Sequence, residues 1–481
     1  MSDAGSDLRS KLLRLESRFT WDLKREHMDL EGLSTRLQDH IDLGFGQRGA
    51  VERSYSYLAY VRYLQGRPEE AASLLSQSEE KTRECFGEES ERRLIVIYGD
   101  RAWLSYHTGD FTQSDKYWRR VEDILVKYPT SSPTVLHPEV YGEKAWTFLK
   151  FSMLYYPKAI DCFLKALELQ PDDSEWNAGY AIALYRTEQR RPGTFLKAEE
   201  SPAVKQLRRA SEIDPADGVM LALLALKLSS YKKHQEAEAL MERALEIGPD
   251  CPHVTRYVAK YLRQQGQVDR SIDLLKRALQ RSSQSAFIHH QLALCYKKKK
   301  MALLNRKPYC NQEMQRLRRL RIQHLKEAVR LKPSFIIAMA ELALMYAEDK
   351  DMSRAEEMFQ ALEMSSEKDE SNRSFVHLHC GQFHQYHTKK EDLAITHYTK
   401  GLLLTPETSE RKRCATKLKQ IAERRLSRDA ADSEALGLLG LVSRAKGDRR
   451  RAVEYYEKAL ECDLDNDQYL SALCELRLDL Q

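Results

Sequence analysis

Cysteine pairs at metal-binding or redox spacing are absent from this 481-residue sequence, because none of its nine cysteines forms a C-x-x-C motif. The first residues, MSDAGSDLRS, contain no apolar stretch of the kind found in a secretory leader. These absences predict a reduced, cytoplasmic protein whose thiols are structural. No apolar run approaches the roughly 20 residues that cross a bilayer, so we expect no membrane partner.

Signatures of phosphate-binding and hydrolytic enzymes are missing as well. The patterns GxGxxG, GxxxxGK[ST], HExxH and GxSxG do not occur, and no nucleophile–base pair stands out. The sequence therefore predicts a binding protein and not an enzyme.

Acidic residues are missing from two neighbouring stretches, although the whole chain has 77 Lys and Arg against 72 Asp and Glu. None lies between Cys251 and Val268 or between Leu274 and Gln312. The second stretch and its continuation contain Lys276, Arg277, Arg281, Lys297 to Lys300, Arg306, Lys307, Arg316, Arg318, Arg319 and Arg321. A solvated charged face is one explanation of such a run, but its length favours a polyanionic partner.

A helical repeat runs along the chain. In YYPKAIDCFLKALELQPD, the residues Ala159, Phe163, Ala166 and Pro171 follow one another at offsets of 4, 3 and 5. The offsets recur in Ala203, Leu207, Ala210, Pro215; in Ala237, Met241, Ala244, Pro249; in Ala394, Tyr398, Gly401, Pro406; and in Ala452, Tyr456, Ala459. Small residues let helices approach, a large one fills the gap and proline ends the second helix, as in tetratricopeptide repeats of about 34 residues. The sequence therefore predicts an all-α tetratricopeptide-repeat superhelix enclosing a positively charged groove or tunnel.

The repeats suggest a division of the chain. Weaker units fit residues 52–85, 95–128 and 252–285, and units are interrupted near 186–201 and at 297–320. Residues 8–50 precede the array and contain FTWDL as a candidate buried anchor. We expect N-terminal helices and first units in residues 1–137 and middle units in 138–248. We expect a C-terminal superhelix in 249–481 that includes the basic inserted segment 297–320.

The first helices of the repeats carry a candidate nucleic-acid interface. In RYVAKYLR, Arg256, Lys260 and Arg263 recur at i, i+4 and i+7, so they share one helical face, which we expect to look into the concave side. Other first helices add Trp146, Lys150, Arg186, His290, Gln291 and Lys297. Cations interleaved with rings suit single-stranded nucleic acid. The plainer alternatives are that Trp146 is a core residue and that Arg186 complements a helix C-terminus.

Two other interpretations compete with this one. A peptide-binding scaffold is the commonest use of such arrays, and it predicts Asn-rich inner helices, of which Asn177 is the obvious example. A metal site is suggested by His377, Cys380, His384 and His387, which lie near one helical face. A straight helix cannot present four ligands to one ion as a tetrahedron, so we expect no metal and no other cofactor.

Several stretches resemble one family over nearly the full length. They are FTWDL (19–23), YLAYVRYLQG (57–66), AWTFLKF (145–151), GYAIALYR (179–186), LALKL (224–228), RYVAKYLR (256–263), HHQLALCYK (289–297), MYAE (345–348) and ALCELRL (472–478). The family is that of the interferon-induced proteins with tetratricopeptide repeats. The resemblance implies a cytoplasmic innate-immune effector that binds the 5′ end of single-stranded foreign RNA, triphosphorylated or capped without 2′-O-methylation, and sequesters it from translation. It also implies family members, or a second copy of the chain, as partners.

The resemblance assigns roles to individual positions. It places Arg36, His40, Lys150 and Arg186 at the 5′ phosphates, and Trp146, Ile182 and Gly44 at the pocket for the cap base. It places Tyr156, Arg256, Tyr257, Lys260, Arg263, Phe287, His290 and Gln291 along the path of the first nucleotides. The departures are His40 for a glutamine, Gly44 for an apolar residue, and Gly32 for an acidic residue that can hold a metal ion beside the phosphates. Gly32 therefore argues against magnesium bound with the phosphates.

Overall fold

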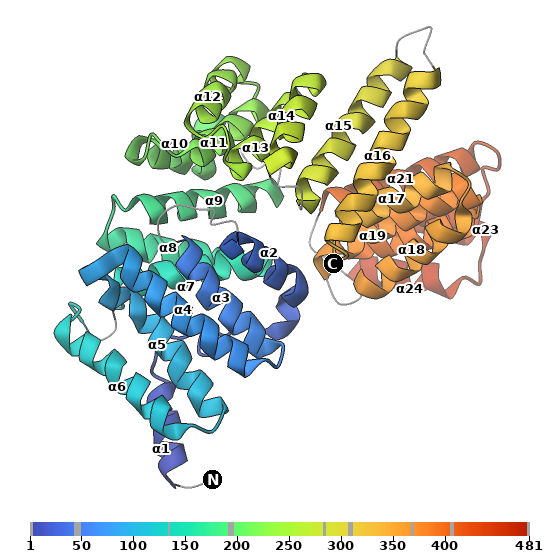
Figure 1. Ribbon diagram of the computed structural model, residues 1–481. Coiled ribbons are helices and arrows are strands. Elements are labelled where there is room, and N and C mark those ends of the chain that lie inside the picture. The colour runs from blue at the N-terminus through green and yellow to red at the C-terminus, as the bar shows by residue number, and fades with distance from the viewer. Residues whose placement is uncertain are drawn as a thin grey trace. The chain divides into compact units, whose positions relative to one another are not determined.

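The computed structural model describes residues 3–42, 50–132, 135–190, 197–281, 285–305, 311–366, 370–404 and 408–478. Within these residues the chain is built of helices, without strands (Figure 1). It divides into two compact units, Met1–Arg281 and Ser282–Gln481. The predicted all-α fold is confirmed. The predicted three-part division at residues 137 and 248 stays a prediction.

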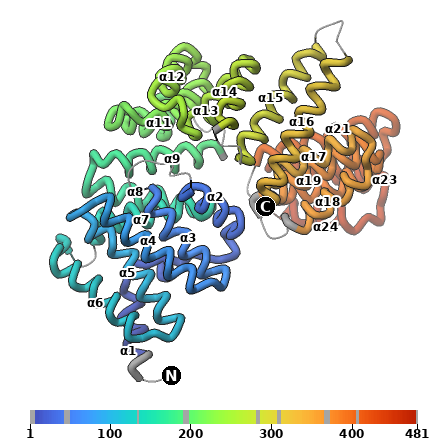
Figure 2. The backbone as a smooth tube through the Cα atoms, in the orientation of Figure 1, coloured from blue at the N-terminus to red at the C-terminus, as the bar shows by residue number. Residues whose placement is uncertain are grey.

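The helices of the first unit are α1 (Asp3–Leu12), α2 (Leu30–Asp42), α3 (Ala50–Leu64), α4 (Pro68–Phe86), α5 (Ser90–His107), α6 (Phe111–Lys127), α7 (Pro138–Phe151), α8 (Tyr156–Leu169), α9 (Ser174–Arg190), α10 (Pro202–Ile213), α11 (Gly218–Ser230), α12 (His234–Ile247), α13 (Pro252–Gln264) and α14 (Val268–Arg281). Those of the second are α15 (Ala286–Leu304), α16 (Asn311–Leu331), α17 (Ile336–Glu348), α18 (Met352–Ser366), α19 (Glu370–Phe383), α20 (Glu391–Leu403), α21 (Ser409–Leu426), α22 (Ser433–Ala445), α23 (Arg449–Cys462) and α24 (Asp467–Leu478). Figure 2 traces how consecutive helices double back on each other.

Consecutive helices pack as hairpins, such as α3 with α4, α7 with α8 and α22 with α23. The predicted small–large–small positions on the second helices are buried, including Ala159, Phe163 and Ala166. Close approach explains the small residues on the facing helix, because a Cβ added at Gly179 would lie 2.3 Å from Cζ of Phe163. The packing rule read from the sequence therefore operates in the folded chain.

Two of the turns between paired helices use a glycine in the left-handed conformation. Gly66 follows α3 with φ of 80°, and Gly266 follows α13 with φ of 86°. Side-chain-bearing residues avoid this left-handed region, so glycine allows the chain to reverse within a few residues. The weaker repeat units predicted at 52–85 and 252–285 therefore have the expected turn.

The segment before the repeat array is anchored by Trp21, as predicted, and also by Arg18, which the sequence did not reveal. Trp21 of FTWDL is buried. Beside it, the fully buried Arg18 forms ion pairs with Asp100 of α5 and Glu143 of α7, and donates to Oγ of Ser56 at 3.0 Å. Burial alone would lower the pKa of Arg18, but the two carboxylates raise it, so the guanidinium stays charged.

In the folded chain, acidic residues from another part of the sequence lie close to the basic stretch around the inserted segment. Lys297 of α15 lies 3.0 Å from Glu341, and Arg318 of α16 lies 2.6 Å from Asp349. These acids belong to α17 or directly follow it, so the packing of repeats neutralises part of the run. Arg306 and Lys307 lie outside the described residues.

Candidate nucleic-acid interface

Cations from several helices of the first unit converge. Arg36 lies on α2, Lys150 on α7, Arg186 on α9 and Arg256 on α13, and the uncharged His40 of α2 lies near Lys150. Helices α7, α9 and α13 are the first helices of repeat pairs, as expected from the sequence. Arg53 of α3 and Lys260 of α13 are neighbours of these cations. We define the basic cluster as Arg36, Arg53, Lys150, Arg186, Arg256 and Lys260.

Lys150 lies close to the other cations of this cluster, which affect its pKa. Its pKa is lowered to about 7, by burial and by four cations: Arg186, Arg53, Arg36 and Arg256. The side chain is nevertheless exposed to solvent, and no ion pair with an acidic group is found for it within the described part of the chain. Lys150 is therefore packed against protein, is still reached by water and has only positively charged neighbours among the ionised groups. A lysine in such surroundings is suited to binding an anion.

Two histidines in the same surroundings are held neutral. Burial and the charges of Lys150 and Arg53 lower the pKa of His40 to about 4. Burial, Arg256 and Lys150 lower that of His253 to about 3. His40 Nδ1 lies 2.9 Å from Oγ of Ser54, which fixes the ring. Both imidazoles are therefore neutral near pH 7 and add no positive charge to the cluster.

Arg186 is positioned by the neighbouring repeat. Its guanidinium donates to the carbonyl of Leu149, in the last turn of α7, at 3.3 Å. Its Cζ lies 6.0 Å from the ring centre of Tyr156. The contact with a helix C-terminus is the plainer role predicted for Arg186, although the helix is α7 and not its own. One N–H of five serves this bond, so the guanidinium retains donors for a phosphate.

The face of α13 continues the cluster. Arg256 donates to the hydroxyl of Tyr257 at 2.6 Å and its Cζ lies 4.5 Å from that ring centre. Burial raises the pKa of Tyr257, but Arg256 and Arg186 outweigh it and the net shift is downward. Burial and the charges of Arg263 and Arg256 lower the pKa of Lys260. Tyr257 therefore lies close both to cations of its own helix and to Arg186 of α9.

Trp146 combines the two roles that the sequence left open. Its ring is half-buried and meets Phe163 edge-on at 5.4 Å between centres. Two cations also approach it, with Lys150 Nζ at 5.5 Å and Arg53 Cζ at 5.6 Å from the ring centre. Its buried Nε1 finds no acceptor among the described residues. Ile182 and Tyr156 pack on the same core, whereas Gly44 lies outside the described residues.

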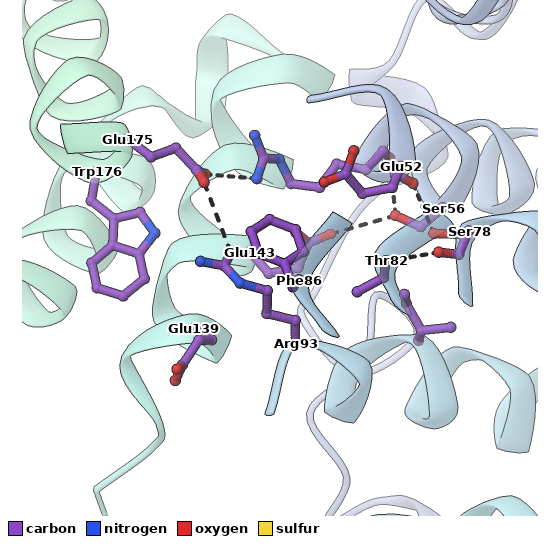
Figure 3. Close-up of a pocket in the computed structure, with 12 residues that line it drawn as sticks. Glu52, Ser56, Ser78, Thr82, Phe86, Arg93, Glu139, Glu143, Glu175 and Trp176 are labelled. Carbon is purple, nitrogen blue, oxygen red and sulfur yellow. Dashed lines mark hydrogen bonds and ion pairs between the residues drawn. The ribbon is translucent and has the colours of Figure 1, made fainter. Parts of the chain in front are cut away.

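Arg53 of α3 was missed by sequence reasoning, since nothing in RSYSY distinguishes it. Its guanidinium pairs with Glu175 at 2.7 Å, and Glu175 also approaches Arg93 (Figure 3). The small cavity there is lined by four glutamates, Glu52, Glu139, Glu143 and Glu175, against two arginines, Arg53 and Arg93, so acidic residues outnumber basic ones. Arg53 therefore separates an acidic interior cavity from the basic cluster.

Three predicted RNA-path residues lie on α15, in the second unit. His290 and Gln291 are buried there, and His290 Nε2 lies 3.8 Å from Glu341 and its ring 4.9 Å from that of Phe335. Phe287 is half-buried. Their assignment to the nucleotide path stays a prediction, as do the roles assigned to the other site residues.

Gly32 of α2 lies beneath an acidic side chain. Its N–H donates to Oδ1 of Asp29 at 3.0 Å, and an added Cβ would lie 2.1 Å from Oδ2. Asp29 thus occupies the space of a side chain at position 32 and raises the pKa of Arg36, which burial and Arg186 lower overall. The predicted absence of a phosphate-bound magnesium ion remains a prediction.

The fold and this cluster define a tetratricopeptide-repeat protein with a cationic binding surface. Tetratricopeptide repeat family models match residues 219–286 and 435–468. The chain is 34% identical to the human "Antiviral innate immune response effector IFIT1" over 97% of its length and 98% of the relative's. It is 31% identical to the human "Interferon-induced protein with tetratricopeptide repeats 2" over 95% of its length and 96% of the relative's. It belongs to the family of interferon-induced proteins with tetratricopeptide repeats, as the sequence motifs predicted.

Two solved human structures are similar as well. They are "Human IFIT1 dimer with m7Gppp-AAAA", with a TM-score of 0.78, and "Human IFIT1 dimer with PPP-AAAA", with a TM-score of 0.76. Each is 32% identical and covers 95% of this chain and 100% of its own. The tetratricopeptide superhelix predicted from the repeats is therefore shared with a protein solved in complex with RNA.

Proposed function

We propose that the protein is an antiviral effector of innate immunity. It binds the 5′ end of single-stranded foreign RNA, bearing a triphosphate or a cap without 2′-O-methylation, and sequesters it from translation in the cytoplasm. The observation that carries the proposal is the convergence of cations from α2, α3, α7, α9 and α13 around Lys150, whose pKa burial and these cations lower to about 7. The human relative's complexes with capped and triphosphate RNA support the same ligand here. The activity is binding, without a chemical step. No helix in the described residues has the length and apolar character needed to span a bilayer.

Single-stranded RNA fits the side chains around the cluster. Tyr156, Tyr257 and Trp146 each have a cation within 4.5 to 6.0 Å of the ring centre. Rings can stack on unpaired bases while the adjacent cations bind phosphates. The test is a comparison of one 5′-triphosphate single strand with its blunt-ended duplex. Clear preference for the single strand is expected, and equal affinity contradicts the proposal.

The peptide scaffold is less well supported. Asn177 is 3% exposed, and its Nδ2 donates to the carbonyls of Pro171 and Asp173 at 2.9 and 2.8 Å. Its Oδ1 accepts from Gln206 at 2.8 Å. The asparagine that the scaffold interpretation invoked is therefore used within the fold.

Self-association is proposed on a different surface. Near the C-terminus, Leu464, Leu470 and Leu478 are 76%, 42% and 72% exposed. These side chains are available for a contact, and the solved human relative is described as a dimer. Sedimentation velocity measures this directly, and a monomer at all concentrations would contradict it.

RNA affinity should fall as pH rises above 7. Free Lys150 has a pKa of about 7, whereas a bound phosphate favours its charged form, so binding above that pH must take up a proton. The loss is up to roughly tenfold per pH unit. Fluorescence anisotropy with 5′-triphosphate RNA between pH 7.5 and 9 avoids the phosphate's own titration near about pH 6.

Lys150→Arg is the matched control for this dependence, because arginine stays protonated throughout. It should bind with a flat profile over the same range. A wild-type profile that is already flat would show that Lys150 does not contact the anion.

Removal of the Trp146 ring should affect capped RNA selectively. The triphosphate end is expected to bind at least as tightly as the unmethylated cap, and a base stacked on tryptophan contributes about 1–3 kcal/mol. Trp146→Ala should therefore weaken capped RNA about 5- to 150-fold and triphosphate RNA far less. Trp146→Phe keeps a ring and should retain most of the affinity. Equal losses for both RNAs, with a lowered melting temperature, would make Trp146 a core residue only.

A further inference from the structure

A cluster of potential metal ligands lies in the second unit, apart from the basic cluster. Glu363 of α18, His377 of α19 and His397 of α20 bring ligand atoms within 4.8 Å of one another. His377 Nδ1 lies 3.4 Å from His397 Nδ1, which lies 3.3 Å from Oε1 of Glu363. Because the three residues come from consecutive helices, the packing of repeats fixes their positions.

Two of the three separations, both from His397, match the edges of a coordination tetrahedron. Zinc binds histidine nitrogen at about 2.0–2.1 Å and carboxylate oxygen at about 2.0–2.2 Å. Two such ligands at the tetrahedral angle lie about 3.3–3.5 Å apart. The measured 3.4 and 3.3 Å fall in this range and exceed the roughly 2.9 Å of a typical N–H···O hydrogen bond.

The chemistry of the side chains is also suitable. His377 and His397 each offer an imidazole nitrogen to the cluster, and imidazole is among the side-chain groups that zinc binds most often. The ring of His384 stacks on that of His397 at 5.3 Å, and its own Nδ1 lies 3.1 Å from Oγ1 of Thr388. His384 therefore supports the orientation of His397 and is not itself placed as a ligand.

We propose that Glu363, His377 and His397 bind one zinc ion, with water as the fourth ligand. Two imidazoles and a carboxylate favour zinc over magnesium, which prefers an all-oxygen shell. The Glu363 side chain is 38% exposed and leaves a path for the ion. Bound zinc would tie α18, α19 and α20 together and stabilise the second unit.

This proposal departs from the expectation drawn from the sequence. That expectation considered four residues of one helical segment, of which Cys380 is 2% exposed in the apolar core, where burial raises the pKa of its thiol. Glu363 and His397 lie 14 and 20 residues from His377, on other helices, so helical spacing could not reveal them.

The test uses full-length protein stripped of metal and titrated with zinc sulfate. We expect one zinc per chain by calorimetry and by elemental analysis after gel filtration, and a higher melting temperature by circular dichroism. Magnesium chloride at the same concentration should do neither. Glu363→Gln and His377→Gln should each weaken zinc binding by at least about tenfold, the loss typical when even a supporting group is removed.

His387→Gln is the matched control, since His387 lies in the same histidine-rich segment but packs on Phe383. It should bind zinc like the wild type. If His377→Gln fails to fold, the partly exposed Glu363→Gln decides. Absence of zinc binding, or equal binding by Glu363→Gln and the wild type, would overturn the proposal.

Discussion

Arg186→Glu should abolish binding of 5′-triphosphate RNA while the protein melts like the wild type. Arg186 lies among like charges and lowers the pKa of Lys150 and of Arg36, so its guanidinium is close to both. One charge-assisted hydrogen bond contributes about 1.5–3 kcal/mol, and a carboxylate in its place adds repulsion. Affinity should therefore fall by at least about 100-fold, measured by fluorescence anisotropy.

Arg119→Glu provides the control for this reversal. Arg119 is 71% exposed on α6, pairs with Asp115, and changes the net charge by the same amount. Its reversal should alter RNA affinity by less than about threefold, because a distant exposed charge is screened by salt. Retained binding by Arg186→Glu, or equal loss by Arg119→Glu, would show that the cluster does not hold the 5′ phosphates.

Arg18→Ala should lower the free energy of unfolding of the first unit by about 3–5 kcal/mol, because removal of one partner leaves buried charges uncompensated. The charges left behind are Asp100 and Glu143. Glu143 lies on α7, the helix that also presents Trp146 and Lys150. RNA binding should weaken along with stability.

The five tryptophans make this measurable in isolation, since Trp21, Trp103, Trp118, Trp146 and Trp176 all belong to the first unit. Urea unfolding followed by tryptophan fluorescence therefore reports on that unit. Arg119→Ala, which removes an exposed pair, should cost no more than about 1 kcal/mol. Similar costs for the two variants would mean that the Arg18 network is not needed for stability.

The repeat was predictable because it depends only on residues that lie close together in the sequence. Offsets of 4, 3 and 5 residues identify the buried face of each second helix, and the register then assigns Lys150, Arg186 and Arg256 to first helices. These three cations converge because the repeats stack on one another. The family resemblance supported the same prediction. The buried anchor at Trp21 was likewise visible as an apolar motif outside the repeat.

What the sequence could not reveal depends on contacts between distant repeats. Arg18 reaches Asp100 across 82 positions, and Arg53 reaches Glu175 across 122. Contacts of the same kind neutralise part of the basic stretch, because Glu341 approaches Lys297 and Asp349 approaches Arg318 from the next repeat. Charge segregation along a chain therefore indicates an interface only where neighbouring helices do not supply the opposite sign.

The central claim is that the basic cluster recognises the phosphates at the 5′ end of a single strand. The most direct measurement compares one RNA sequence bearing a 5′-triphosphate or a 5′-hydroxyl, with affinities determined over a series of salt concentrations. The triphosphate form should bind at least about tenfold more tightly, and its log–log salt slope should be steeper by about 0.7 per additional phosphate contacted. Equal affinities with equal slopes for the two RNAs would contradict the claim.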